Sequence, residues 1–246
     1  MSDTMSHAAR MDHTYRYQRR VYDLTRRYYL LGRDRMIADL DPPEQGRVLE
    51  IACGTGRNLA RIAHRYPGRA LCGLDISQEM LLTAQGRLGG QAALARADAC
   101  DFDGAALFGP GGFDRVVLSY SLSMIPDWRG ALQQAAWQLR PGGALHVVDF
   151  GQQSGLPGGF RRLLQLWLAR FHVAPRADLQ AEMQAIAQAR GFTLRYSALY
   201  RDYAQYGVLT RPETQDAADT DRRCAKTPAA RRGLPRQTGP LDLAAG

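Results

Sequence analysis

A pair of glycines directly after a short apolar run is the part of this chain best suited to holding a ligand. The run Val48–Ile51 has the composition of a buried strand, Gly54 and Gly56 follow it, and a helical pattern begins at Arg57. Glycines let a backbone approach a ligand closely, and the start of the next helix offers unpaired N–H groups to an anion. A dinucleotide site needs a third glycine three positions after the second, where this chain has Leu59. The pattern therefore weakens the pyrophosphate interpretation and favours another ligand.

Carboxylates stand at the ends of the next two apolar runs. Asp75 closes the run that begins at Arg69, and Asp98 follows the run Gln91–Arg96. A carboxylate in the first of these places can accept hydrogen bonds from both ribose hydroxyls of an adenosine. NAD sites share this feature, so Asp75 indicates a nucleoside ligand without naming it. Taken alone, Asp98 could equally be an aspartate in a surface turn.

The elements that must position these groups alternate between strand and helix, which predicts a parallel α/β sheet. In such sheets the carboxyl ends of the strands meet at one edge, where ligands bind. The expected strands are 48–51, 69–74, 91–96, 113–119, 144–149, 192–200 and 203–210. The expected helices are 15–40, 57–66, 77–88, 128–139, 160–171 and 178–190. We expect Ser77 to cap the third of these helices, and Gly191 to end the last.

Residues 50–56 resemble the first motif of the class I S-adenosylmethionine-dependent methyltransferases, an acidic strand end followed by (Gly/Ala)-Cys-Gly-Thr-Gly. The resemblance covers residues 45–210, and Ala52 stands where glycine is commoner. It implies an α/β Rossmann-like fold with a seven-stranded, mostly parallel sheet whose last strand is antiparallel. It also implies S-adenosylmethionine as the cofactor, with the Asp98 side chain on the adenine amino group. The expected cofactor-binding residues are Glu50, Ala52, Cys53, Gly54, Gly56, Asp75, Ile76, Asp98, Ala99 and Ser119.

The flanking sequence points to an acceptor. Residues 15–34 look like the leader helix of the bacterial betaine-lipid N-methyltransferases, and residues 53–59, 121–128, 171–176 and 203–206 extend the similarity. The resemblance implies trimethylation of the amino group of diacylglyceryl-homoserine. The leader is similar, more loosely, to bacterial phosphatidylethanolamine N-methyltransferases. The alternatives are therefore an N-methyltransferase for phosphatidylethanolamine or a small-molecule amine and, from another class, a non-catalytic cofactor-binding subunit.

Spacing, composition and the resemblance together predict three parts in the chain. They are an amphipathic helical leader at 1–44, a methyltransferase domain at 45–210 with a helical insertion at 151–176, and a disordered tail at 211–246. The implied setting is the cytoplasm, at the inner face of the membrane where the lipid substrate lies. A separate enzyme that makes diacylglyceryl-homoserine is the implied partner.

The insertion carries an apolar stripe rimmed by arginines. Large apolar residues recur at helical spacing at positions 160, 163, 164, 167 and 171, and arginines flank them at 161, 162 and 170. Such a helix suits a lipid headgroup interface, and ordinary packing against the sheet is the alternative. Given the resemblance, we expect an interfacial lid in which Trp167 touches the substrate.

Methyl transfer to an amine depends mainly on aligning the lone pair with the sulfonium methyl. The α-amino group of a peptide has a pKa of ~8, so a weak base suffices. Tyr120, after the fourth strand, is the first candidate to face the amine. Its hydroxyl oxygen could accept an N–H bond, and its ring could make a cation–π contact with the ammonium. The alternative is that Tyr120 is an aromatic residue of the core. Asp149 and His172 are further catalytic candidates. A homoserine carboxylate needs a cationic partner, and Arg33 or Arg176 could bind it bidentately.

The bulk composition excludes several other classes. The net charge of +8 comes almost wholly from arginine, since Lys226 is the only lysine, and it favours anionic partners that include lipid surfaces. We expect no nucleic-acid partner, because no RNA-binding module or base-methylating Asn-Pro-Pro-Tyr motif is present. The four cysteines are scattered, which predicts reduced thiols in the cytosol and neither a metal site nor disulfides. No apolar run approaches the roughly 20 residues of a membrane-spanning helix.

Overall fold

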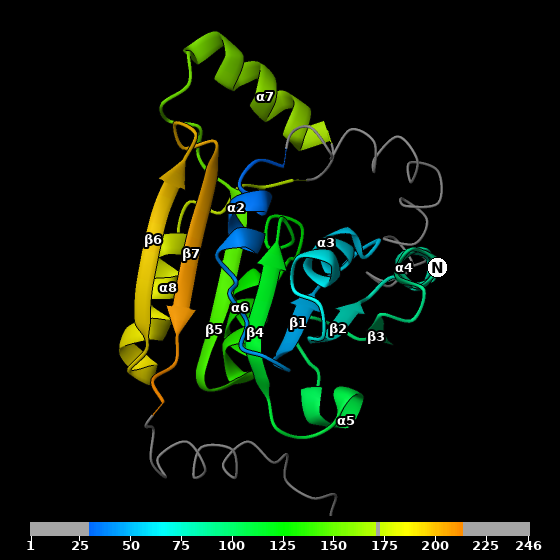
Figure 1. The fold of residues 1–246 in the computed structure, drawn as a ribbon. Coiled ribbons are helices and arrows are strands. Elements are labelled where there is room, and N and C mark those ends of the chain that lie inside the picture. Colours follow the sequence, from blue (N-terminus) through cyan, green and yellow to red (C-terminus); the bar gives the residue numbers. More distant parts are fainter. Residues whose placement is uncertain (1–29, 171–172, 214–246) are drawn as a thin grey trace, which may run out of the picture. The chain divides into compact units, whose positions relative to one another are not determined.

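A computed structural model describes residues 30–170 and 173–213, and in this part of the chain a seven-stranded sheet lies between two layers of helices (Figure 1). The strand order is β3-β2-β1-β4-β5-β7-β6; β1 to β5 pair in parallel, and β7 runs antiparallel to both β5 and β6. The strands are β1 (Arg47–Ile51), β2 (Ala70–Asp75), β3 (Ala92–Arg96), β4 (Phe113–Ser119), β5 (Leu139–Phe150), β6 (Thr193–Leu199) and β7 (Ala204–Thr210). This topology confirms the predicted Rossmann-like fold and its antiparallel last strand.

Helices cover both faces of the sheet, as the continuous burial of residues 48–51 in β1 requires. Val48 packs with the helices of one face, whereas Leu49 and Ile51 pack with those of the other. The first layer contains α2 (Arg33–Ala38), α3 (Arg57–Arg65) and α4 (Gln78–Leu88). The second contains α6 (Trp128–Trp137) and α8 (Leu179–Arg190). Glu50 points to the same side as Val48, toward α2 and α3, because side chains alternate along a strand.

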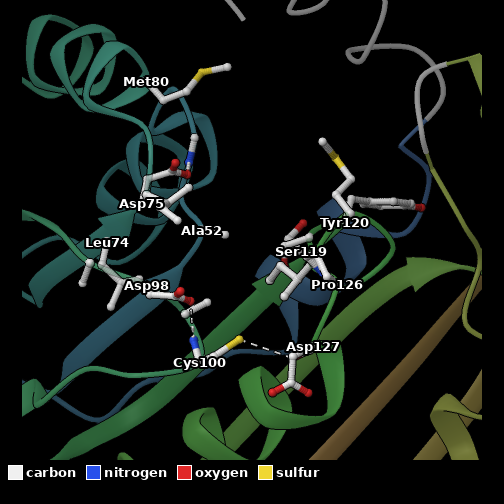
Figure 2. A pocket seen from close by; sticks show the side chains of 17 residues that line it. Ala52, Leu74, Asp75, Met80, Asp98, Cys100, Ser119, Tyr120, Pro126 and Asp127 are labelled. Atoms are coloured by element: carbon white, nitrogen blue, oxygen red, sulfur yellow. Dashed lines mark hydrogen bonds between the residues drawn. The ribbon is translucent and has the colours of Figure 1, made fainter. Parts of the chain in front are cut away.

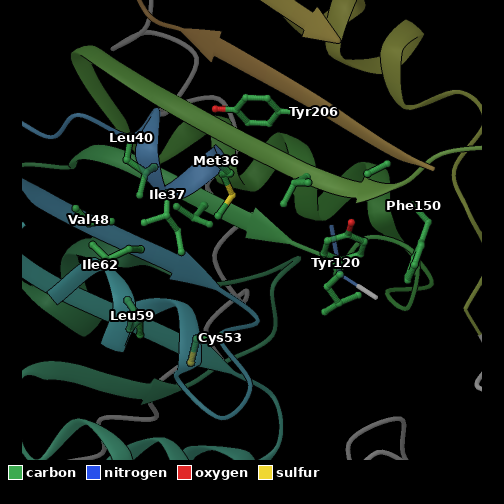
Figure 3. Packing of buried hydrophobic residues seen from close by; sticks show 14 of the residues in the cluster. Met36, Ile37, Leu40, Val48, Cys53, Leu59, Ile62, Tyr120, Phe150 and Tyr206 are labelled. Atoms are coloured by element: carbon green, nitrogen blue, oxygen red, sulfur yellow. The ribbon is translucent and has the colours of Figure 1, made fainter. Parts of the chain in front are cut away.

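Of the described part of the expected helix 15–40, only α2 is helical, so the expected continuous helix is interrupted. Gly32 has a left-handed backbone with φ of 87°, and α2 begins only after it. A Cβ at Gly32 would lie 3.1 Å from Leu199 Cδ1 and 3.3 Å from Val148 Cγ2, so glycine lets the chain approach β5 and β6. Beyond this turn the apolar side of α2 enters the core (Figure 3). Residues 1–29 of the expected leader lie outside the described residues.

Local signals at helix ends behave as predicted. The Ser77 side chain accepts a hydrogen bond from the Met80 N–H, and Gly191 ends α8 with a left-handed φ of 64°. Both results confirm the expected caps. The helix α5 (Gly104–Phe108) is absent from the predicted elements, and its cap Asp103 accepts hydrogen bonds from two backbone N–H groups. A helix of five residues is too short to display an apolar stripe, so periodicity cannot reveal it.

In its described residues, the insertion between β5 and α8 contains one helix, α7 (Gly158–Arg170). In Figure 1 it lies on the side of the sheet at which β1 and β4 end. No helix among the described residues combines the length and apolar character needed to cross a membrane. The expected tail lies outside the described residues from position 214 onward.

Candidate functional site

A cavity of about 330 Å³ opens at the carboxyl ends of β1, β2 and β4 (Figure 2). Its size falls within the range of small-molecule sites. The structure brings seven of the ten predicted cofactor-binding residues to its wall, namely Ala52, Gly54, Asp75, Ile76, Asp98, Ala99 and Ser119. The strands thus gather side chains that are up to 67 positions apart in the sequence, from Ala52 to Ser119.

The turn after β1 is held by the carboxylate at the end of β2. The Gly54 N–H donates to Asp75 Oδ2 at 2.8 Å, and the Ser77 N–H donates to Asp75 Oδ1 at 2.9 Å. A carboxylate oxygen has room for more than one hydrogen bond, so Asp75 can fix the turn and still accept from a ribose. A Cβ built on Gly54 would meet nothing within 4 Å, so this glycine leaves space open. The turn after β1 and the cavity wall are therefore held by the same carboxylate.

Gly56 has a different role from the one predicted. It does not line the cavity, and a Cβ there would lie 3.0 Å from both Ala84 Cβ and Leu88 Cδ1. With its φ of 70°, Gly56 allows α3 to pack closely on α4. The sequence could not show this because the contact comes from a helix more than 25 residues later in the chain.

The opposite end of the cavity is largely apolar. The carboxylate of Asp98 accepts a hydrogen bond from the Cys100 N–H at 2.9 Å, which fixes the turn after β3. Burial, reinforced by the neighbouring charge of Asp98, raises the pKa of the Cys100 thiol to about 11. The thiol therefore stays neutral near pH 7. The wall also includes residues that sequence reasoning missed, since single apolar side chains carry no distinctive signal: Met80, Ala97, Met124, Ile125 and Pro126.

A smaller cavity of about 60 Å³ adjoins the first, and the two share Ala52, Gly54, Met80 and Ser119. Its wall contains the predicted residues Glu50, Cys53 and Arg33. Glu50 Oε1 accepts a hydrogen bond from Asn58 Nδ2 at 2.7 Å, whereas its buried Oε2 has no hydrogen-bond partner among the described residues. Burial raises the pKa of Glu50 to about 8.

The Tyr120 side chain does not have the predicted orientation. Its hydroxyl donates to the Leu31 carbonyl, and its ring packs edge-on against Phe150 with centroids 4.7 Å apart. Figure 2 shows the ring on the side away from Asp75 and Asp98. The residue borders the cavity, but its side chain is buried in the core, where burial raises the pKa of the phenol well above its usual value. The core-aromatic alternative describes this side chain, and a catalytic role stays a prediction.

Asp149 and Arg176 hold the loop after β4 in place. Asp149 is fully buried and accepts hydrogen bonds from the N–H groups of Phe150 at 2.7 Å and Ser123 at 3.0 Å. Arg176 donates to the carbonyls of Leu122 at 3.0 Å and Ile125 at 2.9 Å. These contacts shape the cavity wall and place both side chains in positioning roles, in contrast to the predicted catalysis and acceptor binding.

The remaining candidates belong to the insertion. Trp167 is half-buried and packs against the core cluster beneath α7. It does not line the cavity, so the predicted contact with the substrate has no support from its position. His172 lies outside the described residues.

Comparisons with known proteins agree with this geometry. Residues 48–143 match the family model described as a methyltransferase domain. The chain contains a class I S-adenosylmethionine-dependent methyltransferase domain. It is 33% identical over 118 residues to a malonyl-[acyl-carrier protein] O-methyltransferase of Magnetococcus marinus, with 48% of this chain and 43% of that protein covered. It is 32% identical over 145 residues to a ubiquinone/menaquinone biosynthesis C-methyltransferase of Dinoroseobacter shibae, with 58% and 56% covered.

The chain spans about half the length of these curated relatives. Among solved structures, phosphoethanolamine N-methyltransferase 2 of Haemonchus contortus in complex with S-adenosyl-L-methionine superposes with a TM-score of 0.59. Its sequence identity is 18%, and the match covers 74% of this chain and 52% of that one. This likeness shows a shared fold.

S-adenosylmethionine is the cofactor of such a domain, and the cavity walls fit its parts. Asp75 offers a carboxylate to the ribose, and Asp98 with the Ala99 backbone offers polar atoms to an adenine edge. The Oε2 atom of Glu50 is a buried acceptor placed to receive a ligand ammonium. When bound, the cofactor supplies a sulfonium-activated methyl group.

Proposed function

We propose that this protein transfers methyl groups from S-adenosylmethionine to the amino group of a lipid headgroup at a membrane surface. Diacylglyceryl-homoserine is the proposed acceptor, and the trimethylated betaine lipid is the proposed product. The sequence resemblance described above supports the choice of headgroup. The exposed apolar side of α7 is the observation that carries the lipid part of the proposal.

Two large apolar side chains of α7 face solvent side by side. Leu163 is 66% exposed and Leu166 is 64% exposed, and their spacing of three places them on one face of the helix. The opposite side is anchored, because Leu168 is almost fully buried. A neighbouring pair of exposed leucines indicates a surface that is covered by something apolar when the protein works.

The charges around this leucine pair indicate what covers it. Three arginines of α7, at positions 161, 162 and 170, are exposed beside the leucines. Arginine side chains next to an exposed apolar face complement anionic lipid headgroups, with the apolar residues entering the headgroup boundary. α7 also lies on the side of the sheet where the cavity opens (Figure 1). The proposed location is therefore peripheral, at the cytoplasmic face of the membrane.

Buried polar atoms in the cavity wall support an amine as the acceptor. Asp75 and Asp98 lie across the cavity from Ser119, as Figure 2 shows. The Oγ atoms of Ser119 and Ser121 are buried there without hydrogen-bond partners among the described residues. A serine oxygen can accept an amine N–H and orient the lone pair, and an amine near its own pKa needs no strong base.

The protein's contribution to catalysis would be alignment and exclusion of water. Asp149 and Arg176 fix the loop that carries Ser121, so the acceptor meets a preformed wall. Holding the two reacting atoms in line accounts for much of the gain in such transfers. Each transfer needs the nitrogen as a free base, so a proton leaves the methylated ammonium before the next transfer.

Lipid mass spectrometry tests the acceptor. The purified protein is incubated with methyl-labelled cofactor and with either diacylglyceryl-homoserine or phosphatidylethanolamine in mixed micelles. Gains of one, two and three labelled methyl groups on the homoserine lipid alone would support the proposal. Labelling of phosphatidylethanolamine alone favours the alternative acceptor. No labelling of either lipid, with bound S-adenosylhomocysteine detected, would refute the lipid acceptor. A separate enzyme that makes the homoserine lipid is the proposed partner.

Vesicle binding tests the role of α7. We expect Leu163→Asn with Leu166→Asn to weaken binding to phosphatidylglycerol-containing vesicles by at least about tenfold, since burying one leucine contributes ~1.5 kcal/mol or more. The matched control is Leu82→Asn with Leu107→Asn, which removes two leucines that are 53% and 39% exposed on α4 and α5. Equal losses in both double variants would contradict a specific role of α7.

A further inference from the structure

The turn between β6 and β7 holds three successive residues in an unusual backbone conformation. Tyr200, Arg201 and Asp202 have left-handed φ values of 54°, 58° and 63°. This conformation disfavours residues other than glycine, asparagine and aspartate, because the Cβ atom approaches the following carbonyl oxygen. A tyrosine and an arginine are therefore not the residues that stabilise such a turn best. Strain that persists at residues of this type points to a function of their side chains.

The side chains of the first two residues of the turn are exposed. Tyr200 is 53% exposed, and Arg201 is exposed beside it. Leu31 is a third exposed side chain in this neighbourhood, since a Cβ built on the adjacent Gly32 would lie 3.9 Å from Tyr200 Cε2. Tyrosine combines an apolar ring with a polar hydroxyl, which suits the boundary between lipid and water.

Hydrogen bonds join this turn to the segment that leads into α7. The Gly151 N–H donates to the Tyr203 carbonyl at 2.9 Å. The Asp202 carbonyl accepts the N–H of Gln153 at 2.7 Å, and its carboxylate accepts the Ser154 hydroxyl at 2.8 Å. A Cβ at Gly151 would overlap the Asp202 carbonyl oxygen, so glycine allows the two segments to lie this close. The turn is therefore fixed to the start of the insertion that carries α7.

The turn also lies at the edge of the sheet where the cofactor cavity opens. Ala204, the first residue of β7, pairs with Phe150, the last residue of β5. The turn before Ala204 therefore lies at the carboxyl end of β5, next to the strand ends that form the cavity. α7 is on the same side of the sheet (Figure 1).

The charges of the two segments indicate which partner they fit. Residues 151–170 and 199–203 contain four arginines, at positions 161, 162, 170 and 201, and one acidic residue, Asp202. All four arginines are exposed, whereas the Asp202 carboxylate is bonded to Ser154. Exposed arginines beside exposed apolar side chains complement anionic lipid headgroups.

We propose that the β6–β7 turn is a second membrane contact, with Tyr200 entering the headgroup boundary and Arg201 pairing with lipid phosphates. This inference rests on the proposed function, in which α7 is the first contact. A single helix on a membrane leaves the domain free to tilt about the helix axis. A second contact that is fixed to the first removes this freedom and keeps the cavity facing the lipid.

Asparagine substitutions separate this role from a structural one. Asparagine adopts the left-handed conformation more readily than tyrosine or arginine, so Tyr200→Asn and Arg201→Asn should each raise the urea concentration at which the protein unfolds. Both should nevertheless weaken binding to phosphatidylglycerol-containing vesicles. We expect a loss of about fivefold for Arg201→Asn, as for one arginine near an anionic surface. For Tyr200→Asn we expect at least about threefold, because the buried area of the ring is lost.

A tryptophan at position 200 reports directly on contact with lipid. Vesicles that contain brominated phosphatidylglycerol quench the emission of tryptophans that touch the acyl chains. After subtraction of the wild-type signal, Tyr200→Trp should be quenched severalfold more than Leu107→Trp, the matched control. Leu107 is 39% exposed on α5, which lies at the other end of the sheet from α7 (Figure 1).

Unchanged vesicle binding by Tyr200→Asn, together with lost binding in the α7 double variant, would overturn this proposal and leave the proposed function intact. A lower stability of Tyr200→Asn would show that the tyrosine supports the fold, and equal quenching at positions 200 and 107 would show no lipid contact; either result overturns the proposal. A changed oligomeric state of Tyr200→Asn with normal vesicle binding would assign the turn to a protein contact. Failure of the wild type to bind the vesicles would instead refute the proposed function at a membrane surface.

Discussion

Two arginines flank β1, one near each end, and their surroundings differ. Arg47, at the start of the strand, has its guanidinium surrounded by backbone oxygens and by the ring of Phe113, whose centroid lies 4.8 Å from Cζ. The guanidinium donates to the carbonyls of Phe108, Gly109, Pro110 and Gly112. Arg33 lies near the other end, in the wall of a cavity that also contains Glu50.

The difference extends beyond the two arginines. At the start of β1, the buried Asp114 accepts the Arg47 backbone N–H at 2.8 Å and pairs with Arg140. At the carboxyl edge, Glu50, Ser119 and Ser121 each contain a buried oxygen without a hydrogen-bond partner in the described part of the chain. Polar groups buried with full sets of partners hold a fold together, whereas unpartnered ones indicate where a ligand completes the set. The two ends of β1 therefore differ in their surroundings: the Arg47 side chain is bonded within the protein, whereas Glu50 lines a cavity.

Removing Arg47 should have the largest effect on stability. Arg47→Ala leaves four carbonyls without their donor and exposes the Phe113 ring, so we expect the free energy of unfolding to fall by about 2–4 kcal/mol. Affinity for S-adenosylhomocysteine should stay unchanged wherever the variant is folded. Urea unfolding and calorimetry measure the two quantities. Arg61→Ala, which breaks an exposed ion pair, should lower stability by less than about 1 kcal/mol. A large loss of affinity in Arg47→Ala would break the comparison.

A buried histidine in the middle of the sheet should make stability depend on pH. His146 Nδ1 lies 2.9 Å from the Tyr206 hydroxyl, and burial lowers the pKa of His146 to about 3. The unfolded chain protonates this histidine below pH ~6.5 and the folded chain only near pH 3, so stability falls as the pH decreases between these values. At pH 4.5 the loss relative to pH 7 should be about 2–3 kcal/mol.

Urea unfolding at pH 7 and pH 4.5 checks this expectation. His146→Gln should show a smaller loss between the two pH values than the wild type, since the glutamine cannot take up a proton. His64→Gln replaces a histidine on the outer side of α3 and serves as the control. If all three proteins lose stability equally, His146 is not the group responsible. Because His146 has a partner and lines neither cavity, its replacement should not alter nucleoside binding.

Much of the fold could be predicted because its signals are local. The alternation of apolar runs and helical patterns gave the strand segments, and Ser77 and Gly191 mark helix ends through the chemistry of single residues. The position of the cofactor cavity could also be predicted from the sequence, because a parallel sheet brings the carboxyl ends of its strands together. Gly54, Asp75 and Asp98 therefore meet although they are distant in the sequence.

The sequence could not reveal the contacts of side chains whose partners come from distant segments. The Tyr120 hydroxyl bonds to Leu31, and Arg176 bonds to Leu122 and Ile125, more than 50 positions away. No local pattern encodes such pairs, so the sequence offered these residues equally as catalysts or as supports. The break in the expected leader helix at Gly32 has the same origin, because the reason for it lies in β5 and β6.

The smallest predicted effect concerns strain at the ligand end of β1. Ala52 and Gly54 have nearly identical left-handed φ values of 56° and 54°, which L-residues rarely adopt. Ala52→Gly should therefore raise the free energy of unfolding by about 0.5–1 kcal/mol, and Gly54→Ala should lower it by about 1–2 kcal/mol. Thermal and urea unfolding measure both changes.

The affinity for S-adenosylhomocysteine then distinguishes the effect of backbone strain in this turn from the effect of an added methyl group in the ligand space. A methyl group at Gly54 would meet no protein atom within 4 Å, so it would extend into the ligand space and should weaken S-adenosylhomocysteine binding. Ala52→Gly adds no atom and should bind almost as the wild type does. If Ala52→Gly loses both stability and affinity, the alanine methyl packs on the ligand, and the left-handed turn is not under strain. Strain is expected at this end because a tight turn must leave room for a ligand, whereas the Arg47 end has no such requirement.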